Sequence, residues 1–217
     1  MYSVVRFKVV IVIPAYNEES TIRKVIEEVS MYGDVIVVND ASIDSTEKIA
    51  LQAGAIVINH KTNQGYDKTL NSGFIEADKR NYDAVITFDA DNQHNSEMLA
   101  EYIKHLKNGV DLVLGIRPKA ARIGELIFMF YTRMKFNWND PLCGMKGYSM
   151  LLYRQQGYFD SYGSIGTELS IFGLLNKHTF VQLSIPIKER KDKPRFFSTL
   201  GANFYILLAL VKTIMNE

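Results

Sequence analysis

The sequence has one cysteine, almost no net charge and no long apolar run, and each shortage excludes a class of protein. A lone Cys143 excludes an internal disulfide framework and a cysteine-based zinc site, and it fits a reducing compartment. The 25 lysines and arginines nearly balance the 24 aspartates and glutamates, so charge gives no reason to expect nucleic-acid binding. The cleanest apolar stretch near the C-terminus, Phe204–Val211, is far shorter than the ~20 residues that cross a bilayer.

Glycine-rich phosphate loops are missing as well. The sequence contains no Gly-x-x-x-x-Gly-Lys-Ser/Thr motif, and no Gly-x-Gly-x-x-Gly follows its first strand-like run. A phosphorylated ligand would therefore be held by a metal ion and by cationic side chains. What is present is the composition of a soluble globular protein, with 217 residues, 47% of them hydrophobic and 23% charged, which is ample material for a core.

Short aliphatic runs alternate with amphipathic segments between Lys8 and Gly115. Runs this short, and apolar on both sides, are typical of parallel strands buried on two faces. The alternation predicts an α/β fold, a doubly wound and mostly parallel sheet with helices on both faces. The expected strands are 8–13 (ended by Pro14), 34–38, 55–58, 84–88 and 111–115, and the expected helices are 20–32, 45–53, 68–79 and 96–108.

The second half of the chain is less regular. We expect helices over 125–137 and 168–175, a strand over 180–187 and a helix over 200–215. The last of these is the most apolar segment, and it suits a core-packing helix and a helix lying on a membrane surface equally well. Because no repeat or dividing linker occurs, the sequence predicts a single domain over residues 1–217.

Polar clusters follow four of the expected strands, at residues 14–19, 39–44, 89–94 and 115–117. Turn chemistry explains any one such cluster, because Asn, Asp, Ser and Pro favour turns. The carboxyl ends of parallel strands, however, lie at one edge of the sheet, where ligands bind in such folds. Four clusters on the same edge therefore predict a ligand site.

Asp89 and Asp91 form the most informative of these clusters. Two carboxylates one residue apart repel each other unless a cation or a proton lies between them. Oxygen ligands of this kind suit Mg²⁺ or Mn²⁺, which take one or two carboxylates together with substrate phosphate oxygens. Gln93 offers a further neutral oxygen. The pattern predicts a divalent-metal site at this strand end.

Six short motifs occur in a fixed order along the chain. They are Pro14-Ala15-Tyr16-Asn17-Glu18, Asn39-Asp40-Ala41-Ser42-x-Asp44, Asn63-x-Gly65, Asp89-Ala90-Asp91-x-Gln93-His94, Gly115-x-Arg117 and Asp140-Pro141-Leu142-Cys143-Gly144-Met145-Lys146. This order resembles glycosyltransferase family 2, and within it the polyprenyl-phosphate (dolichol-phosphate) mannose and glucose synthases. The resemblance implies a single-domain GT-A fold, a nucleoside-diphosphate sugar donor (a GDP- or UDP-hexose), Mg²⁺ or Mn²⁺, and inversion at the anomeric carbon.

The resemblance also implies roles for individual residues. Residues 1–118 would form the nucleotide-sugar-binding half and residues 119–217 the acceptor half. The residues implied in nucleotide-sugar binding are Pro14, Tyr16, Glu18, Val37, Asn39, Asp40, Asp89, Ala90, Arg117, Arg122, Arg190 and Arg195. The implied metal ligands are Asp89, Asp91 and Gln93, and the implied catalytic residues are Asp91, Asp140 and Glu168.

The acceptor decides whether the reaction needs a base. A polyprenyl phosphate is already an anion, whereas a saccharide hydroxyl must lose a proton to Asp140 or Glu168. In both cases a metal on Asp91 and Asp89, with Arg117 nearby, would stabilise the departing diphosphate. A saccharide acceptor in surface-glycan assembly is the alternative enzyme, and a non-catalytic nucleotide-sugar-binding module is the alternative outside enzymes.

Two departures from the family pattern bear on the substrates. Asn39-Asp40 stands where the family commonly has two carboxylates, which leaves uracil and guanine both open. The C-terminal transmembrane helices of many lipid-phosphate members are absent from the sequence. The basic run Lys188–Arg195, followed by apolar residues, nevertheless favours an anionic membrane surface. We therefore expect a cytoplasmic protein, peripheral on the cytosolic face of the membrane.

Overall fold

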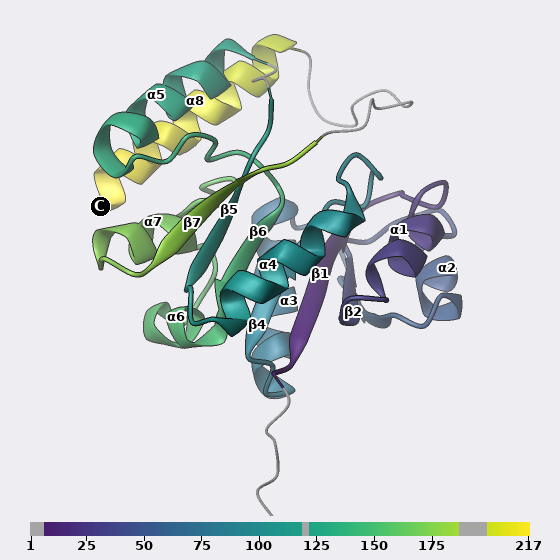
Figure 1. The fold of residues 1–217 in the computed structure, drawn as a ribbon. Coiled ribbons are helices and arrows are strands. Elements are labelled where there is room, and N and C mark those ends of the chain that lie inside the picture. Colours follow the sequence, from purple (N-terminus) through teal and green to yellow (C-terminus); the bar gives the residue numbers. More distant parts are fainter. Residues whose placement is uncertain (1–6, 119–121, 187–198) are drawn as a thin grey trace, which may run out of the picture.

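A seven-stranded sheet organises the chain, which a computed structural model describes over residues 7–118, 122–186 and 199–217 (Figure 1). The strand order is β3-β2-β1-β4-β6-β5-β7. All neighbours pair in parallel except β6, which is antiparallel to both β4 and β5. The strands are β1 Val9–Ala15, β2 Asp34–Asn39, β3 Ile56–Asn59, β4 Ala84–Thr87, β5 Leu112–Ile116, β6 Lys146–Ser149 and β7 Phe180–Ser184.

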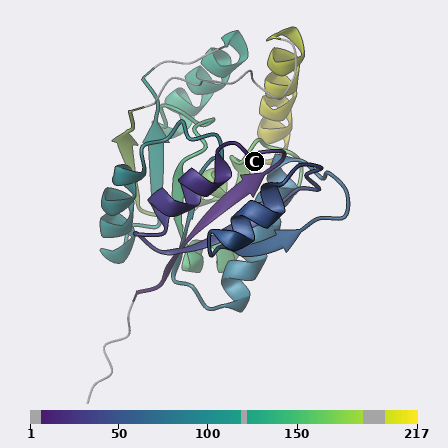
Figure 2. The ribbon, with the colours of Figure 1, turned by 90° about the vertical axis from the view of Figure 1, so that its right-hand side faces the viewer.

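Helices cover both faces of this sheet, as the sequence predicts (Figures 1 and 2). Residues of α1, α2 and α4 share one apolar cluster with the sheet, and residues of α3, α6 and α7 share the other. The helices are α1 Ile22–Val29, α2 Thr46–Gln52, α3 Tyr66–Lys79, α4 Leu99–Lys107 (preceded by a short 3₁₀ turn, Ser96–Met98), α5 Ile123–Phe136, α6 Met150–Gln156, α7 Glu168–Leu175 and α8 Thr199–Asn216.

Strand alternation explains the two-sided core. Ile11 and Ile13 of β1 pack in the cluster beneath α1, while Val10 and Val12 pack in the cluster beneath α3. Successive side chains of a strand point to opposite faces, so a strand covered on both sides must be apolar at every position. All four side chains are fully buried, which confirms the doubly wound fold.

Pro14 does not end the first strand, contrary to the sequence-based expectation. β1 continues to Ala15, and Pro14 lies opposite Val38 of β2. The backbone of Val12 faces β4, where its oxygen accepts the Phe88 N–H at 3.0 Å. Pro14, two residues further, faces the same side, but β4 has already ended at Thr87. The missing proline N–H therefore costs the sheet no hydrogen bond.

Two elements were not predicted from the sequence, β6 and α6. The four residues of β6 are Lys, Gly, Tyr and Ser, so the strand carries no apolar run that a periodicity argument could find. It nevertheless lies inside the sheet, with Lys146 opposite both Thr87 of β4 and Leu114 of β5. This antiparallel insertion carries the Asp140–Lys146 motif to the strand end that bears Asp89.

Helices α5 and α8 form a parallel pair at the carboxyl end of β5 (Figure 1). The Gly124 N–H donates to Asn203 Oδ1 at 2.8 Å, and a Cβ at Gly124 would lie 3.2 Å from the backbone oxygen of Asn203. Phe128, Ile206 and Leu210 are buried between the two helices. In the part of the chain that the structure describes, no helix is both long and apolar enough to cross a bilayer.

Candidate active site

The loops after β1 and β2 are tied into one rim at the carboxyl edge of the sheet. The N–H of Asn17 donates to Ser42 Oγ at 2.9 Å, and Asn17 Oδ1 accepts the N–H of Ile43 at 2.9 Å. The N–H of Glu18 donates to Thr46 Oγ1 at 2.7 Å. Asn is among the residues that tolerate the left-handed φ of 56° that Asn17 adopts here. The rim holds the half-exposed Pro14 and Tyr16 and the nearly buried Glu18 in place.

Asp40 organises the loop that precedes α3. Its carboxylate is 4% exposed and accepts hydrogen bonds from His60 Nδ1 at 2.7 Å and from the N–H groups of Gln64 and Gly65 at 2.8 Å each. The second ring nitrogen of His60 lies 2.8 Å from Ser72 Oγ on α3. The structure thus brings Asp40 to the predicted edge, where three groups of the protein itself bind its two oxygens.

Two other residues of the implied nucleoside pocket are turned inward. Asn39 is buried, donates through Nδ2 to Asn59 Oδ1 at 2.8 Å and accepts the Ser42 N–H at 3.2 Å. Val37 is fully buried in the core beneath α1, because strand alternation points its side chain to that face. Its side chain therefore offers no surface to a ligand.

Asp89 and Asp91 lie in the loop after β4, as the strand pattern predicts. The Asp89 side chain is about one-third exposed (32%), and Asp91 and Gln93 are partly exposed. Asp91 Oδ1 accepts the Gln93 N–H at 3.1 Å. Between them, Asn92 Oδ1 is buried and has no hydrogen-bond partner among the described residues.

A hydrogen bond and two nearby cations favour the ionised form of Asp89. Burial by itself would raise the pKa of Asp89, but His94 Nε2, at 2.9 Å, and the charges of Arg117 and Lys146 outweigh it and lower this pKa. Gly144 approaches the same carboxylate so closely that a Cβ there would overlap it. The carboxylate is therefore charged, oriented and closely packed on one side.

This donor set fits a divalent cation. Two partly exposed carboxylates, an amide side chain and the orphaned Asn92 oxygen are the hard oxygen donors that Mg²⁺ and Mn²⁺ prefer. Among the residues that the structure describes, no three His, Cys, Asp or Glu side chains converge on one point. Asp89, Asp91 and Gln93 would thus supply part of a coordination sphere that a phosphorylated ligand completes.

Arg117, after β5, links the sheet edge to the start of α5. Its guanidinium donates to Asp140 at 2.8 and 2.9 Å and to Glu125 at 3.1 Å, and its N–H donates to Asp140 at 3.0 Å. Burial would lower the pKa of Arg117, but Asp140 and Glu125 raise it. Arg122 adds a second cation, 3.2 Å from Glu125.

Asp140, one of the two carboxylates expected near the acceptor, is therefore fully engaged. It is 2% exposed, and three hydrogen bonds from Arg117 occupy its two oxygens. Glu168, at the start of α7, is also nearly buried and accepts the Ser161 N–H at 2.6 Å and the Ser161 hydroxyl at 2.8 Å. Burial raises the pKa of Glu168.

Buried carboxylates also hold the loop before α7. Asp160 accepts the N–H groups of residues 163 and 164, and Asp67 accepts those of Ile165 and Gly166 at 3.3 and 2.6 Å. Ile165 has a left-handed φ of 59°, which is strained for a β-branched residue. Its side chain packs against Phe128 of the α5–α8 pair. The loop is thereby joined both to the sheet edge and to the helix pair.

Lys146 and Asp67 are residues to which the sequence reading gave no role. Lys146 is buried, donates through Nζ to the Gly166 oxygen at 2.6 Å and lies 5.2 Å from the centre of the Trp138 ring. Burial lowers the pKa of Lys146 to about 8. Its position in the Asp140–Lys146 motif was the available signal, whereas nothing local distinguishes Asp67.

The remaining predicted residues are placed as follows. Ala90 is buried in the core cluster beneath α1. Arg190 and Arg195 lie outside the described residues. Cys143 is buried, and burial raises the pKa of its thiol to about 12, in keeping with a packed residue rather than a nucleophile.

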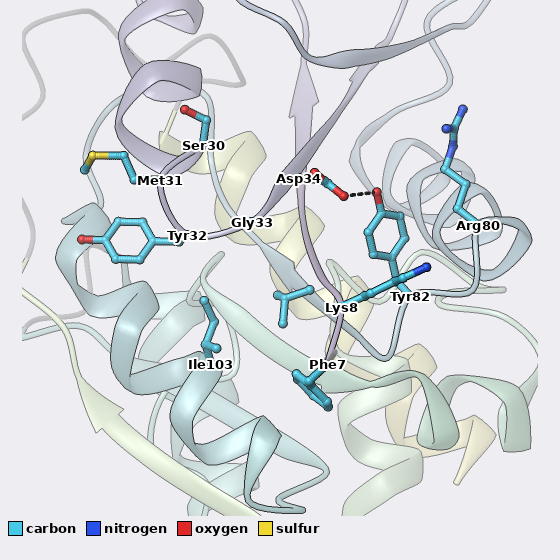
Figure 3. A pocket seen from close by; sticks show the side chains of 11 residues that line it. Phe7, Lys8, Ser30, Met31, Tyr32, Gly33, Asp34, Arg80, Tyr82 and Ile103 are labelled. Atoms are coloured by element: carbon cyan, nitrogen blue, oxygen red, sulfur yellow. Dashed lines mark hydrogen bonds between the residues drawn. The ribbon is translucent and has the colours of Figure 1, made fainter. Parts of the chain in front are cut away.

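A hollow of about 670 Å³ lies at the opposite edge of the sheet, at the amino ends of β1 and β2 (Figure 3). Lys8 and Arg80 stand at its rim, and Tyr82 donates a 2.8 Å hydrogen bond to Asp34 within it. None of the predicted site residues belongs to its described lining. The chemistry-bearing side chains are therefore gathered at the carboxyl edge and not at this hollow.

Comparison with known protein families identifies the family of this chain. The model of glycosyl transferase family 2 matches residues 10–160, which contain β1 from its second residue on and every motif up to Lys146. The chain belongs to glycosyl transferase family 2. This confirms the resemblance drawn from the motif order and identifies a glycosyltransferase.

Family 2 relatives of this chain act on polyprenyl phosphates, according to their names. A dolichyl-phosphate hexose transferase of Haloferax volcanii is 27% identical over 95% of this chain and 94% of its own length. A UDP-N-acetylglucosamine–dolichyl-phosphate N-acetylglucosaminyltransferase of Methanococcus voltae is 28% identical over 64% of this chain and 68% of its own length. Of some other relatives the chain spans less, from 65% down to 33% of their length.

Solved structures confirm the GT-A fold of this family 2 chain. Glucosyl-3-phosphoglycerate synthase of Mycobacterium tuberculosis, in complex with Mg²⁺ and UDP, superposes with a TM-score of 0.77. The match covers 95% of this chain and 78% of the synthase at 24% identity. A complex of the same synthase with Mn²⁺, UDP and glucosyl-3-phosphoglycerate has a TM-score of 0.76.

Proposed function

We propose that this family 2 glycosyltransferase transfers a hexose from a nucleoside-diphosphate sugar to a polyprenyl phosphate, with inversion and with the help of Mg²⁺ or Mn²⁺. The observation that carries the proposal is the state of the two candidate bases. Asp140 is held by three hydrogen bonds from Arg117, and Glu168 by two from Ser161. Neither carboxylate is open to take a proton from a hydroxyl acceptor, so an acceptor that arrives as an anion suits this site.

Cationic side chains at this edge give a second reason to expect a phosphate acceptor. The side chains of Arg117 and Arg122 are 21% and 30% exposed, and Lys146 is buried. Arg is the residue best shaped to bind a phosphate with two hydrogen bonds. We assign Arg117 and Arg122 to the phosphate of the acceptor or of the donor.

The donor would lie along the carboxyl edge. When bound, the divalent ion neutralises the charge that develops on the departing diphosphate. Asp89 and Asp91 would hold it, and Glu18 and the loop fixed by Asp40 would bound the nucleoside. The phosphate oxygen attacks the anomeric carbon as the bond to the diphosphate breaks, so a single displacement gives inversion. A double displacement would need a free carboxylate nucleophile, and Asp140 and Glu168 are both engaged.

The relatives' names and the hydrogen bonds that already occupy Asp140 and Glu168 together favour a lipid phosphate over a saccharide hydroxyl. The acceptor lies in a membrane, so we place the protein on the cytosolic face of that membrane as a peripheral enzyme. We keep both GDP- and UDP-hexoses as candidate donors; the Methanococcus voltae relative is named for a UDP-sugar.

The test compares two acceptors that differ in one group. Transfer from a panel of GDP- and UDP-hexoses is measured to a short polyprenyl phosphate and to the matching polyprenol, in detergent with Mn²⁺ or Mg²⁺. We expect product from the phosphate alone, with the anomeric configuration opposite to that of the donor. Product from the alcohol, or from a saccharide with no lipid, would overturn the assignment of the acceptor.

A variant pair tests the metal-binding role within the same assay. Asp91→Ala removes a partly exposed loop carboxylate and no core volume, so we expect most of the transfer to be lost and the midpoint of thermal unfolding to be kept. Glu101→Ala removes an exposed carboxylate of α4 and serves as the control. Full turnover by Asp91→Ala in saturating Mn²⁺ would exclude Asp91 as a metal ligand.

A further inference from the structure

Helices α5 and α8 each carry a stripe of exposed, large apolar side chains. The positions recur every three or four residues, so each set lies along one side of its helix. The two stripes, together called the α5–α8 apolar face, are Ile123, Leu126, Ile127, Phe130 and Met134 on α5, and Leu200, Phe204, Leu208, Val211 and Met215 on α8. Phe130 is 68% exposed and Phe204 is 72% exposed. A contiguous exposed apolar patch marks a surface that contacts a protein or a membrane.

The two stripes belong to one surface. Buried residues of both helices, Phe128, Ile206 and Leu210, form a cluster against which Ile165 packs. Each stripe lies on the side of its helix opposite to these residues. The helices run parallel and side by side at one end of the molecule (Figure 1). Because each stripe is exposed and opposite to the buried contact, the two stripes form the outer surface of the pair.

The first turn of α5 connects this face to the active site. Arg122 and Glu125 belong to the ion-pair network of Arg117, while Ile123 and Leu126 belong to the apolar stripe. The face therefore begins one residue from Arg122, one of the two arginines assigned to phosphate. A lipid surface covering the face would bring phosphate groups close to Arg122. A second protein copy bound there would instead keep a membrane-bound acceptor away from this arginine.

Charge on α5 favours the same partner. Its exposed charged side chains, Arg133 and Lys135, are both cationic; Lys135 is ion-paired with Glu217, so Arg133 is the exposed cation that no acidic side chain of α5 offsets, and the acidic residue of this helix, Glu125, is 2% exposed and ion-paired. A cationic flank beside an apolar stripe complements anionic lipid. A two-fold dimer through this face would instead bring copies of the same cations together.

We propose that the α5–α8 apolar face docks on the surface of an anionic membrane, with α5 contributing as much as α8. The choice of a lipid partner rests on the proposed function, and the contact itself is testable without any acceptor. An amphipathic helix that binds in this way lies in the plane of the membrane with its apolar side among the acyl chains. The enzyme would then take its acceptor phosphate from the surface on which it rests.

The experiment measures co-sedimentation of the full chain with vesicles that contain no polyprenyl phosphate. Vesicles of phosphatidylcholine with phosphatidylglycerol are compared with vesicles of phosphatidylcholine alone, at low and high salt. Phe130→Ser with Met134→Ser alters α5, and Phe204→Ser with Leu208→Ser alters α8. Met31→Ser with Leu151→Ser is the matched control, because these side chains are 77% and 63% exposed but lie away from the helix pair. Thermal unfolding checks that every variant is folded.

We expect the wild-type chain to prefer the anionic vesicles, and each helix variant to bind them at least about tenfold more weakly, since a tenfold loss is only about 1.4 kcal/mol. The control should bind like the wild type. Wild-type binding by the α5 variant, an equal loss in the control, or a wild-type dimer that the α5 variant dissociates would each overturn the proposal.

The acceptor assay in detergent separates this proposal from the proposed function. Transfer to short polyprenyl phosphate by a wild-type chain that ignores vesicles would refute the docking face and leave the enzyme assignment in place. Vesicle binding by a chain that transfers no hexose to polyprenyl phosphate would support the docking face and refute the proposed function.

Discussion

Replacing Gly144 by alanine should disable the enzyme through Asp89 while leaving the sheet intact. A Cβ on Gly144 would lie 2.6 Å from Asp89 Cγ, whereas carbon atoms settle at about 3.5 Å or more. The backbone of Gly144 is anchored, because the Thr87 hydroxyl donates to its oxygen at 2.6 Å. The carboxylate must therefore move by about 1 Å, and a misplacement of that size costs on the order of 100-fold in rate, or about 2.7 kcal/mol of transition-state stabilisation.

The assay combines kcat/KM for hexosyl transfer with Mn²⁺ affinity in the presence of a nucleoside diphosphate. Both should fall in Gly144→Ala, while the free energy of unfolding changes far less than the activity does. Gly147→Ala is the control in the same segment, since its Cβ would meet the Leu106 and Tyr102 side chains at 3.1 Å, away from Asp89. If Gly144→Ala keeps wild-type kcat/KM and metal affinity, the position of Asp89 is not critical and the reasoning fails.

Three further substitutions test the surroundings of the site. Arg117→Met leaves Asp140 and Glu125 without their main cation and should lower the free energy of unfolding by about 3–5 kcal/mol in urea titrations, whereas an unchanged midpoint would mean that the network contributes little. Phe128→Ala empties a fully buried site between α5, α8 and Ile165 and should cost about 3–5 kcal/mol by the same measurement. Burial and the charge of Asp160 raise the pKa of Asp67 from 3.8 to about 7. The folded chain therefore keeps a proton that the unfolded chain releases, so the free energy of unfolding should fall as pH rises from about 4 to about 7. Asp67→Asn should make the free energy of unfolding depend less on pH over this range. An equal pH dependence in both proteins would contradict the shift.

The carboxyl edge was predictable because burial and periodicity are local properties. Five aliphatic runs gave five of the strands to within one or two residues at each end, and each polar cluster followed one of them. Glu168–Leu175 of α7 was predicted with its bounds as the structure has them. The order of the six motifs along the chain then indicated the family.

Strand β6 could not be predicted from local sequence patterns. Lys146–Ser149 has no apolar pattern, and its place between β4 and β5 follows from pairing with residues 32 to 65 positions away. Only that antiparallel insertion brings Gly144 against Asp89 and Lys146 beneath the loop before α7. The motif was visible in the sequence, but the contact it makes was not.

The sequence by itself determined which residue types stand at the site, and the tertiary structure decided which of them are open. Asp140 is a candidate base in the sequence, and only the structure shows that Arg117, 23 residues away, binds both of its oxygens. Asp40 is predicted to line the nucleoside pocket, and only the structure shows that His60 and the N–H groups of Gln64 and Gly65 also bind its carboxylate. Sequence pattern reports burial along one element, whereas the partner of a carboxylate depends on how distant loops meet. The same limit applies to α5, whose exposed stripe became visible only once α8 was found to lie along its other side.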